Sequence, residues 1–269
     1  PDSASLELYN PDLDQLNTED LTELGMSMED AVKAADKRVV SIPYLGVSRG
    51  RKESLLLSSR GVSYSKQTNE VAAWCGPLLQ DADSRKSGMQ IYHRREWDPH
   101  VGKRIAEEAV EKAAELLKAS PISGGKLPVV LDENMAPRFL GMFFGAFSAE
   151  SAQRGMSRLQ ERLGETIAIP ELTLLDDPHR KGANRSRFLD AEGFLTKALP
   201  LIEDGVFRNF LYHVESASKE NKSSTGHAVR GYSGGISTGS HNLVWPGGEY
   251  SLEQLCSLNN KCLLVTQLE

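Results

Sequence analysis

The chain has 269 residues, of which 39% are hydrophobic and 25% are charged, and its formal net charge is −6. This length is enough to bury a sizeable core, as one large domain or two small ones. Nucleic-acid binding is disfavoured, because such proteins carry a basic patch and this acidic chain has no run of Lys and Arg. A membrane partner is also disfavoured, since no apolar run approaches the roughly 18 residues that cross a bilayer.

The three cysteines, Cys75, Cys256 and Cys262, are too few for a disulfide framework. A sparse, odd number of cysteines is typical of proteins in the reducing cytosol. We therefore expect a cytoplasmic protein with small buried or half-buried thiols.

The first part of the chain predicts two helices around a β-rich region. Asn17 or Thr18 can cap the first helix, and acidic residues follow in its first turn. Asp98-Pro99 opens the second helix, with Asp as the cap and Pro at the first helical position. Short connections between successive strands, including a polar one at 81–88, favour an antiparallel meander between the two helices. The extended candidates are 39–47, 53–58, 62–74 and 89–97.

A change in composition at 122–126 divides the chain into a helix-plus-meander region, 1–121, and a second region, 122–269. In the second region Asp204-Gly205 predicts a tight hairpin turn, since Asp-Gly supplies the positive φ that such turns need. The predicted fold class is α+β: an antiparallel β meander with flanking helices, followed by a mixed α/β region around a buried Phe-rich helix. The other predicted elements are strands at 127–131, 171–175 and 262–269, a helix at 151–163 and a Gly/Ser-rich loop at 223–248.

The Phe-rich helix is predicted from Leu140 to Ala149. Its apolar residues recur at i, i+3, i+4 and i+7, the spacing of one helix face. Gly141, Gly145 and Ala149 form a stripe of small residues on another face, which would let a second backbone come close. The four apolar positions are Leu140, Phe143, Phe144 and Phe147.

Gly46-Val-Ser48-Arg-Gly50 fits the G-x-S-x-G pattern of a hydrolase nucleophile elbow. That chemistry needs a helix immediately after the serine, whereas residues 51–57 predict a strand. A hairpin turn at 46–50 is therefore favoured over a nucleophile. A serine hydrolase using Ser48 remains a weak alternative.

Metal ligands and phosphate loops give no strong signal. His227 and His241 with Cys256 or Cys262 could in principle assemble a zinc site, but nothing in their spacing favours it over solvated histidines. The acidic pair Asp176-Asp177 precedes Pro178 and is ordinary turn chemistry. The glycine-rich stretch at 234–240 lacks the Lys-Ser/Thr pair of a P-loop, and is expected instead to offer a peptide-contacting edge.

Six segments, taken in their order, resemble the TldD/PmbA family, also called "modulator of DNA gyrase" proteins. The most informative is Leu163-Gly-Glu-Thr-Ile-Ala-Ile-Pro-Glu-Leu-Thr-Leu-Leu-Asp-Asp-Pro178, which looks like the family's "LG-x-x-(V/I)-x-x-P-x-L-T-(I/V)-x-D-D-P" block. Each of the others is weak alone, and their shared order makes the resemblance specific. They are Leu8–Asp14, Phe188–Gly193, Ile202–Val206, Ser224–His227 and Leu264–Leu268.

TldD-type chains of this family carry H-E-x-x-x-H on a helix and take a further Cys ligand, whereas PmbA chains, also called TldE, lack that motif. Gly141, Met142 and Ala146 stand where the two His and the Glu would be, so this chain resembles the PmbA branch. Such a chain carries over no catalytic or metal-binding residue and no cofactor. The resemblance implies a zinc ion in a TldD-type partner.

The resemblance further implies a heterodimeric metallopeptidase that acts on unfolded or extended peptides. Contact with peptide or partner is expected at Thr225, Gly226, His227, Gly234 and Gly235. Relative to the family, an N-terminal portion and a shorter C-terminal portion are expected to lie outside this sequence. The alternative is a self-dimer or larger homo-oligomer that binds extended peptides without cleaving them.

Overall fold

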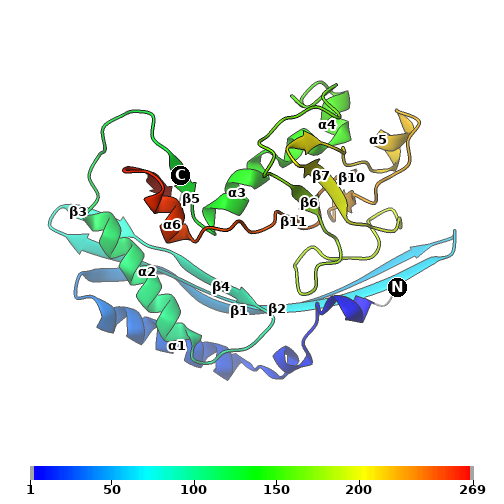
Figure 1. Ribbon diagram of the computed structural model, residues 1–269. Helices are drawn as coiled ribbons and strands as arrows, with labels where there is room; N and C mark the ends of the chain where they lie inside the picture. Colours follow the sequence, from blue (N-terminus) through cyan, green and yellow to red (C-terminus); the bar gives the residue numbers. More distant parts are fainter. Residues whose placement is uncertain (1–2, 267–269) are drawn as a thin grey trace. The chain divides into compact units, whose positions relative to one another are not determined.

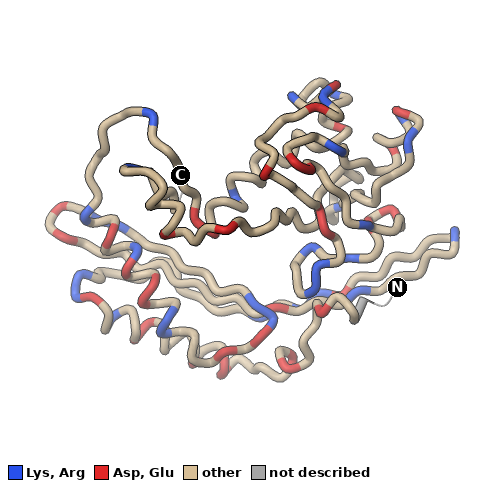
Figure 2. Tube along the Cα trace, viewed as in Figure 1, with Lys and Arg blue, Asp and Glu red and all other residues tan. Residues whose placement is uncertain are grey.

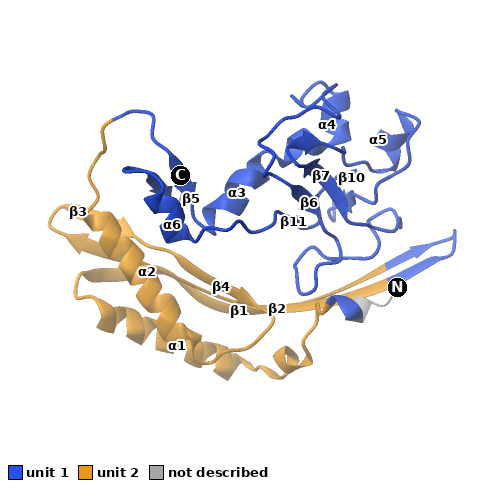
Figure 3. Cartoon of the chain, viewed as in Figure 1, with its two compact units in different colours: residues 1–6, 56–64, 124–269 blue, residues 7–55, 65–123 orange. Residues whose placement is uncertain are grey.

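The computed structural model describes residues 3–266, which form two compact units (Figure 3). Unit 2 comprises residues 7–55 and 65–123, and unit 1 comprises 1–6, 56–64 and 124–269. The chain changes unit between Ser123 and Gly124, and the tip of the long β1–β2 hairpin also belongs to unit 1.

Unit 2 contains the two predicted helices, α1 (Thr18–Ala35) and α2 (Val101–Leu117). The predicted cap of α2 is wrong: its N-cap is His100, without a side-chain cap bond, and Asp98 Oδ1 accepts from the His100 backbone N–H in the turn before the helix. Asn17 caps α1 as predicted: its Oδ1 accepts hydrogen bonds from the backbone N–H of Glu19 at 2.7 Å and of Asp20 at 3.1 Å. The Asp20 carboxylate in turn accepts from the Asn17 backbone N–H at 2.7 Å, which completes a capping box. The start of α1 is therefore fixed by residues next to one another in sequence.

The sheet of unit 2 is built on β1 (Val39–Ser58) and β2 (Val62–Asp81), two strands of 20 residues each. β2 pairs antiparallel with both β3 (Ser84–Ser87) and β4 (Gln90–Arg94), and β1 is hydrogen-bonded to the opposite edge of β2. The connection predicted at 81–88 therefore contains a short strand. The meander itself is confirmed.

The hairpin turn predicted at 46–50 is wrong, because β1 continues through it. The structure gives a different reason for glycine here. A Cβ on Gly46 would lie 2.4 Å from the Trp74 ring on β2, so glycine makes room for a cross-strand aromatic side chain. Ser48 therefore lies in the middle of a strand, without the strand-turn-helix that a nucleophile elbow requires.

Helices α1 and α2 pack against each other and cover one face of this sheet (Figure 1). The apolar side chains of each helix recur at three- and four-residue spacing, which places them on one face toward β2. Their burial supplies the hydrophobic stabilisation of unit 2. The main contributors are Leu24, Met28 and Val32 of α1, Ile105, Ala109 and Ala113 of α2, and Ala73, Cys75 and Leu79 of β2.

Unit 1 is a mixed region of short elements around a four-stranded sheet in the order β11-β6-β7-β8. β9 and β10 form a separate antiparallel pair, and β12 pairs parallel with β5. The strands are β5 (Val129–Leu131), β6 (Leu174–Asp176), β7 (Leu199–Glu203), β8 (Val206–Phe207), β9 (Ala228–Arg230), β10 (Ile236–Thr238), β11 (Leu243–Val244) and β12 (Leu263–Val265). The helices are α3 (Met135–Met142), the 3-10 turn η3 (Phe144–Phe147), α4 (Ala149–Gln153), α5 (Val214–Ser218) and α6 (Leu252–Ser257).

The α+β fold class is confirmed, and so is the hairpin at Asp204-Gly205. Both turn residues have positive φ, 49° and 77°, and Glu203 pairs with Val206 across them. The Gly/Ser-rich segment 223–248, predicted as loop, contains three short strands. The helix predicted at 151–163 ends at Gln153, and the strand predicted at 262–269 spans Leu263–Val265, with residues 267–269 outside the described part.

The Phe-rich segment is divided between α3 and η3, and only its last part enters the core. Phe147 is 4% exposed and packs edge-to-face on Phe207, whereas Phe143 is 52% exposed. The two glycines of the small-residue stripe are not packed inside the chain, since a Cβ on Gly141 or Gly145 would meet nothing within 4 Å, whereas Ala149 is buried in the core. The residue spacing predicts a buried helix, but the part of the segment around Phe143 is exposed to solvent.

Candidate functional site

A buried carboxylate, Asp176, is the centre of the one group of potential metal ligands found among residues 3–266. It is the last residue of β6, where the flanking strands β7 and β11 pair with it at Leu199 and Leu243. The backbone N–H of His241 donates to both carboxylate oxygens, at 3.0 Å and 2.9 Å. The side chain of Asp176 is fully buried, so these contacts replace its hydration.

His227, directly before β9, lies against the same carboxylate. Its Nε2 is 2.9 Å from Asp176 Oδ2, and its Nδ1 is 2.8 Å from Thr225 Oγ1. His227 has no exposed surface. Both ring nitrogens therefore have a polar partner in the interior.

His241, in the connection between β10 and β11, completes the group. Its Nε2 is 2.9 Å from the carbonyl oxygen of Gly226, and its ring centroid is 4.7 Å from that of His227. Its other ring nitrogen, Nδ1, is buried without a hydrogen-bond partner. One ligand atom from each of the three side chains lies within 4.8 Å of the others.

Burial makes His241 a neutral imidazole. Desolvation lowers its pKa from 6.5 to about 4, against the opposing effect of the Asp176 charge. Near neutral pH its Nδ1 therefore keeps a free lone pair when Nε2–H donates to Gly226. That is the form of histidine that binds a metal ion.

The group is closed to substrates, since all three side chains are at most 1% exposed. Catalytic metal sites keep an open position for water or substrate, whereas structural sites are enclosed. The arrangement can therefore hold an ion or a proton. It does not present an open catalytic position to a peptide.

The residues predicted to contact peptide fall into two places. Gly226 and His227 are buried and Thr225 is half-buried, so they help to form the closed group. Gly226 has a φ of 77°, and a Cβ there would lie 2.7 Å from the carbonyl oxygen of Leu195. Gly234 and Gly235 are exposed in the β9–β10 connection, where peptide contact stays a prediction.

The cysteines suggested as partners of His227 and His241 are not part of the group. Cys256 lies in the last turn of α6, and Cys262 directly precedes β12. The Cys262 thiol donates to the Cys256 carbonyl oxygen at 3.4 Å. The third potential ligand beside the two histidines is Asp176 and not a cysteine. The sequence Asp176-Asp177-Pro178 predicts only a turn, because nothing near it in sequence shows that two distant histidines approach Asp176.

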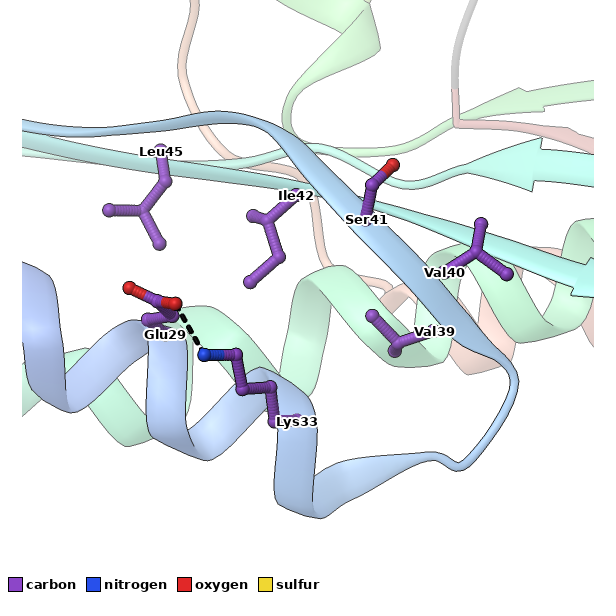
Figure 4. A pocket seen from close by; sticks show the side chains of 7 residues that line it. All are labelled: Glu29, Lys33, Val39, Val40, Ser41, Ile42 and Leu45. Atoms are coloured by element: carbon purple, nitrogen blue, oxygen red, sulfur yellow. Dashed lines mark hydrogen bonds and ion pairs between the residues drawn. The ribbon is translucent and has the colours of Figure 1, made fainter.

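Hollows also occur away from this group, and two of them adjoin sheet strands. One, of about 410 Å³, is lined by α1 and the start of β1 and carries the Lys33–Glu29 ion pair beside aliphatic side chains (Figure 4). The other, of about 380 Å³, lies beside β11 and combines Leu140 and Trp245 with the polar side chains of Arg180 and Asn242. The second hollow adjoins a sheet edge, since β11 is the terminal strand of its sheet.

Comparison with known families gives two matches that together cover most of the chain. Residues 124–269 match the PmbA/TldA metallopeptidase C-terminal domain, and residues 11–117 match the PmbA/TldA metallopeptidase central domain. The chain belongs to the PmbA/TldD family. The predicted resemblance is thereby confirmed.

Individual PmbA/TldD relatives agree with this assignment. The metalloprotease PmbA homolog of Haemophilus influenzae is 26% identical over 269 residues, which is 99% of this chain and 57% of the relative. A crystal structure from Thermotoga maritima, described as a modulator of a DNA gyrase, matches with a TM-score of 0.87 at 26% identity over 98% of this chain and 60% of that one. TldE from Thermococcus kodakarensis matches with a TM-score of 0.84 at 25% identity over 97% and 59%. The chain thus spans somewhat more than half the length of these relatives.

Two of the PmbA/TldD sequence blocks meet at the buried group. The block ending in Asp176-Asp-Pro178 supplies the carboxylate, and the block Ser224–His227 supplies one imidazole. Block membership marks Asp176 and His227 one by one as candidate residues, but it does not show that they are neighbours. His241 lies outside the blocks, and only the structure places it.

The residues at the expected position of the PmbA/TldD zinc helix do not fit a zinc ion. Gly141 and Met142 end α3, and Ala146 lies in η3, so the positions are not on one continuous helix. Glycine and alanine side chains offer no donor atom, and Met142 offers only a thioether. No catalytic step through zinc follows from these three residues.

Proposed function

We propose that this chain is a PmbA/TldE-like, non-catalytic subunit of a heterodimeric TldD–TldE zinc metallopeptidase that acts on unfolded or extended peptides. The proposal rests on the family match and on our sequence interpretation that Gly141, Met142 and Ala146 stand where TldD-type chains carry H-E-x-x-x-H. A zinc peptidase needs ligands and a carboxylate to activate water. The TldD-type partner would supply both.

The peptide role is supported by the free edge of the unit 1 sheet. β11 is hydrogen-bonded to β6 and has no further strand beyond it among residues 3–266. Such an edge can take an extended peptide as an added strand, with backbone hydrogen bonds for affinity and adjacent pockets for side chains. The hollow with Leu140, Trp245 and Arg180 lies beside this edge.

The name "modulator of DNA gyrase" gives no physical reason to expect DNA binding here. Basic and acidic residues are interspersed along both units (Figure 2), and the net charge is −6. DNA binding depends on clustered Lys and Arg that neutralise phosphates. We therefore propose peptides and a protein partner in place of nucleic acid, in the reducing cytosol, where three free thiols persist.

The test is a reconstitution with a TldD-type chain that carries H-E-x-x-x-H. Cleavage of an unfolded peptide substrate is expected from the mixture and not from this chain alone, even after incubation with zinc. Replacing the partner's motif histidines by alanine should abolish cleavage, although the two chains still co-elute in gel filtration. Peptide cleavage by this chain alone would overturn the proposal.

The alternative is a homo-oligomer that binds extended peptides without cleaving them, favoured by the same free edge at β11. It predicts that peptide is retained on the chain and stays intact when a TldD-type partner is added. Mass spectrometry of the retained peptide distinguishes the peptidase subunit from the homo-oligomer. Intact peptide and no complex with the partner would favour the homo-oligomer.

A further inference from the structure

We propose that Asp176, His227 and His241 form a closed, non-catalytic metal site that takes one divalent ion of the zinc class inside unit 1. Two independent observations carry the proposal. Ligand atoms of the three buried side chains lie within 4.8 Å of one another, and His241 Nδ1 is buried with no hydrogen-bond partner. A bound ion would satisfy the unpaired nitrogen, whose isolation in the interior is otherwise unfavourable.

His241 already has the surroundings of a metal ligand. Metal-binding histidines almost always donate the second ring N–H to a carboxylate, a backbone carbonyl or water, which fixes the tautomer. Here Nε2 is 2.9 Å from the Gly226 carbonyl oxygen, so the proton sits on Nε2 and the lone pair on Nδ1. The backbone N–H of the same residue holds Asp176 next to it.

His227 can release Nε2 to a metal without losing its other contact. In the structure Nε2 lies 2.9 Å from Asp176 Oδ2, and Nδ1 lies 2.8 Å from Thr225 Oγ1, whose hydroxyl donates to the Tyr212 carbonyl oxygen at 3.1 Å. With an ion on Nε2, the ring proton sits on Nδ1 and donates to Thr225 Oγ1, which is free to accept because its own proton faces Tyr212. The ring therefore stays hydrogen-bonded through Thr225 when Nε2 binds the ion.

The donor set indicates the class of metal. Two imidazole nitrogens and one carboxylate oxygen suit Zn²⁺ and its neighbours better than Mg²⁺ or Ca²⁺, which prefer oxygen ligands. The second oxygen of Asp176 or a water molecule completes four-coordination. Zinc bonds of about 2.0–2.2 Å place ligand atoms about 3.3–3.6 Å apart in a tetrahedral site, so the group contracts around the ion.

The ion would connect three segments of unit 1 that are distant in sequence: the end of β6, the turn before β9 and the connection to β11. It would be additional to the catalytic zinc of a TldD-type partner. Residues 141–146 would still bind no metal, as the sequence predicts, but the chain would bind one at this second place. Because all three ligands are buried, this ion does not depend on the proposed peptidase function.

The test is metal stoichiometry on the full chain, purified without a histidine tag and stripped with a chelator. After incubation with Zn²⁺ and gel filtration, elemental analysis should find about one zinc per chain, and the melting temperature should rise because the ion binds the folded state. Replacement by Co²⁺ should give the visible absorption of a tetrahedral site. A stripped chain that takes up no zinc and shows no change in melting temperature would overturn the proposal.

His241→Gln is the decisive variant, because the Gln amide can still donate to the Gly226 carbonyl oxygen while the Nδ1 ligand is removed. Zinc affinity, measured against a chromophoric chelator, should fall by more than the roughly 10- to 100-fold typical of a lost outer partner. His100→Asn is the matched control, since His100 is exposed and makes no side-chain cap bond, and it should bind zinc as the natural chain does. Equal zinc affinity in His241→Gln and the natural chain would contradict the assignment.

Thr225 is expected to position His227 and not to bind the ion itself. Thr225→Val should weaken zinc binding by roughly 10-fold, and Thr225→Ser, which keeps the hydroxyl, should restore it. Rescue by serine distinguishes a hydrogen-bonding role from simple packing. None of these experiments measures peptide cleavage. Their results therefore test the metal site independently of the proposed subunit function.

Discussion

At the scale of single residues, buried polar groups in unit 1 differ in how completely their hydrogen bonds are met. His213 Nδ1 lies 2.9 Å from Thr238 Oγ1 and 3.1 Å from Ser216 Oγ, so this buried histidine is held by two hydroxyl groups. His241 is equally buried and keeps one ring nitrogen unpaired. His213 also lies outside the group of potential metal ligands, so His241, and not His213, is assigned to the ligand site.

Asp36 contributes stability that depends on pH. The Arg38 guanidinium, 2.6 Å away, and the Arg38 backbone N–H lower the pKa of Asp36 from 3.8 to about 2. A carboxyl with a lowered folded pKa stabilises the fold above its unfolded pKa, and this stability is lost as pH falls from about 4 to 2. Asp36→Asn should therefore lower the urea midpoint at pH 7 and have progressively less effect as pH falls below 4.

The control for this prediction is Asp83→Asn, which removes a carboxylate from an exposed position. Its urea midpoint should stay close to that of the natural chain at every pH. An Asp36→Asn effect of the same size at pH 7 and pH 2.5 would contradict the assigned role of the Arg38 pairing.

Cys75 is expected to be the unreactive thiol of the three. It is fully buried on β2, and burial raises its pKa to about 11, so little thiolate forms near neutral pH. Iodoacetamide at pH 8 should alkylate the half-buried Cys256 and Cys262 in the native chain and spare Cys75 until denaturant is added. Mass spectrometry of tryptic peptides measures this, and modification of Cys75 at the rate of the other two would be inconsistent with its packing.

At the scale of elements, two glycines, Gly88 in unit 2 and Gly141 in unit 1, have opposite surroundings. Gly88, before β4, approaches the backbone of α2 so closely that a Cβ would lie 2.1 Å from the Ala109 carbonyl oxygen and 2.7 Å from the Ala113 nitrogen. A Cβ on Gly141, in α3, would meet nothing within 4 Å. Sequence alone gives both residues the same side chain and cannot separate these situations.

Gly88→Ala should therefore destabilise the chain by about 1–3 kcal/mol, the usual cost of overpacking, because helix backbone cannot move aside as a flexible side chain can. Gly141→Ala is the matched control, and should be neutral or stabilising by up to about 1 kcal/mol through helix propensity. Chemical denaturation of both variants measures the difference. A neutral Gly88→Ala would show that α2 does not pack on this connection.

Elements are predictable where their determinants are local. The capping box at Asn17 and the Asp204-Gly205 turn each depend on residues a few positions apart, and both are as expected. The break predicted within β1 and the continuous Phe-rich helix are not observed. In β1 the deciding contact is across the sheet, from Gly46 to Trp74, and in the Phe-rich segment it is the packing of Phe147 on Phe207.

At the scale of the whole molecule, the unit boundaries do not follow the sequence order. The tip of the β1–β2 hairpin belongs to unit 1, where the Phe188 backbone N–H donates to the Tyr64 hydroxyl at 3.3 Å. Near the start of the chain, the Leu6 carbonyl oxygen accepts from the Gly182 N–H at 2.8 Å. Among residues 3–266, no helix has the combination of length and apolar composition needed to cross a bilayer.

A fragment of residues 124–269 should accordingly be less stable than the same residues in the full chain. It lacks Leu6 and Tyr64, which are 2% and 9% exposed, and burying one large apolar side chain contributes about 1.5–3 kcal/mol. Hydrogen exchange should be faster in the fragment around 182–194, with the full chain as the reference. Identical exchange in the two would show that the N-terminal segment and the hairpin tip add nothing to unit 1.

The sequence by itself determined the fold class, the capped start of α1, the Asp-Gly hairpin and, through six ordered blocks, membership of the PmbA/TldD family. These depend on local chemistry or on patterns that stay in register along the chain. Only the tertiary structure decided the buried group, because His227 and His241 are 51 and 65 positions away from Asp176 and meet it through the pairing of β6 and β11 and the turn at Gly226. Spacing along a chain does not encode such a contact, since strand pairing and burial select which distant residues become neighbours.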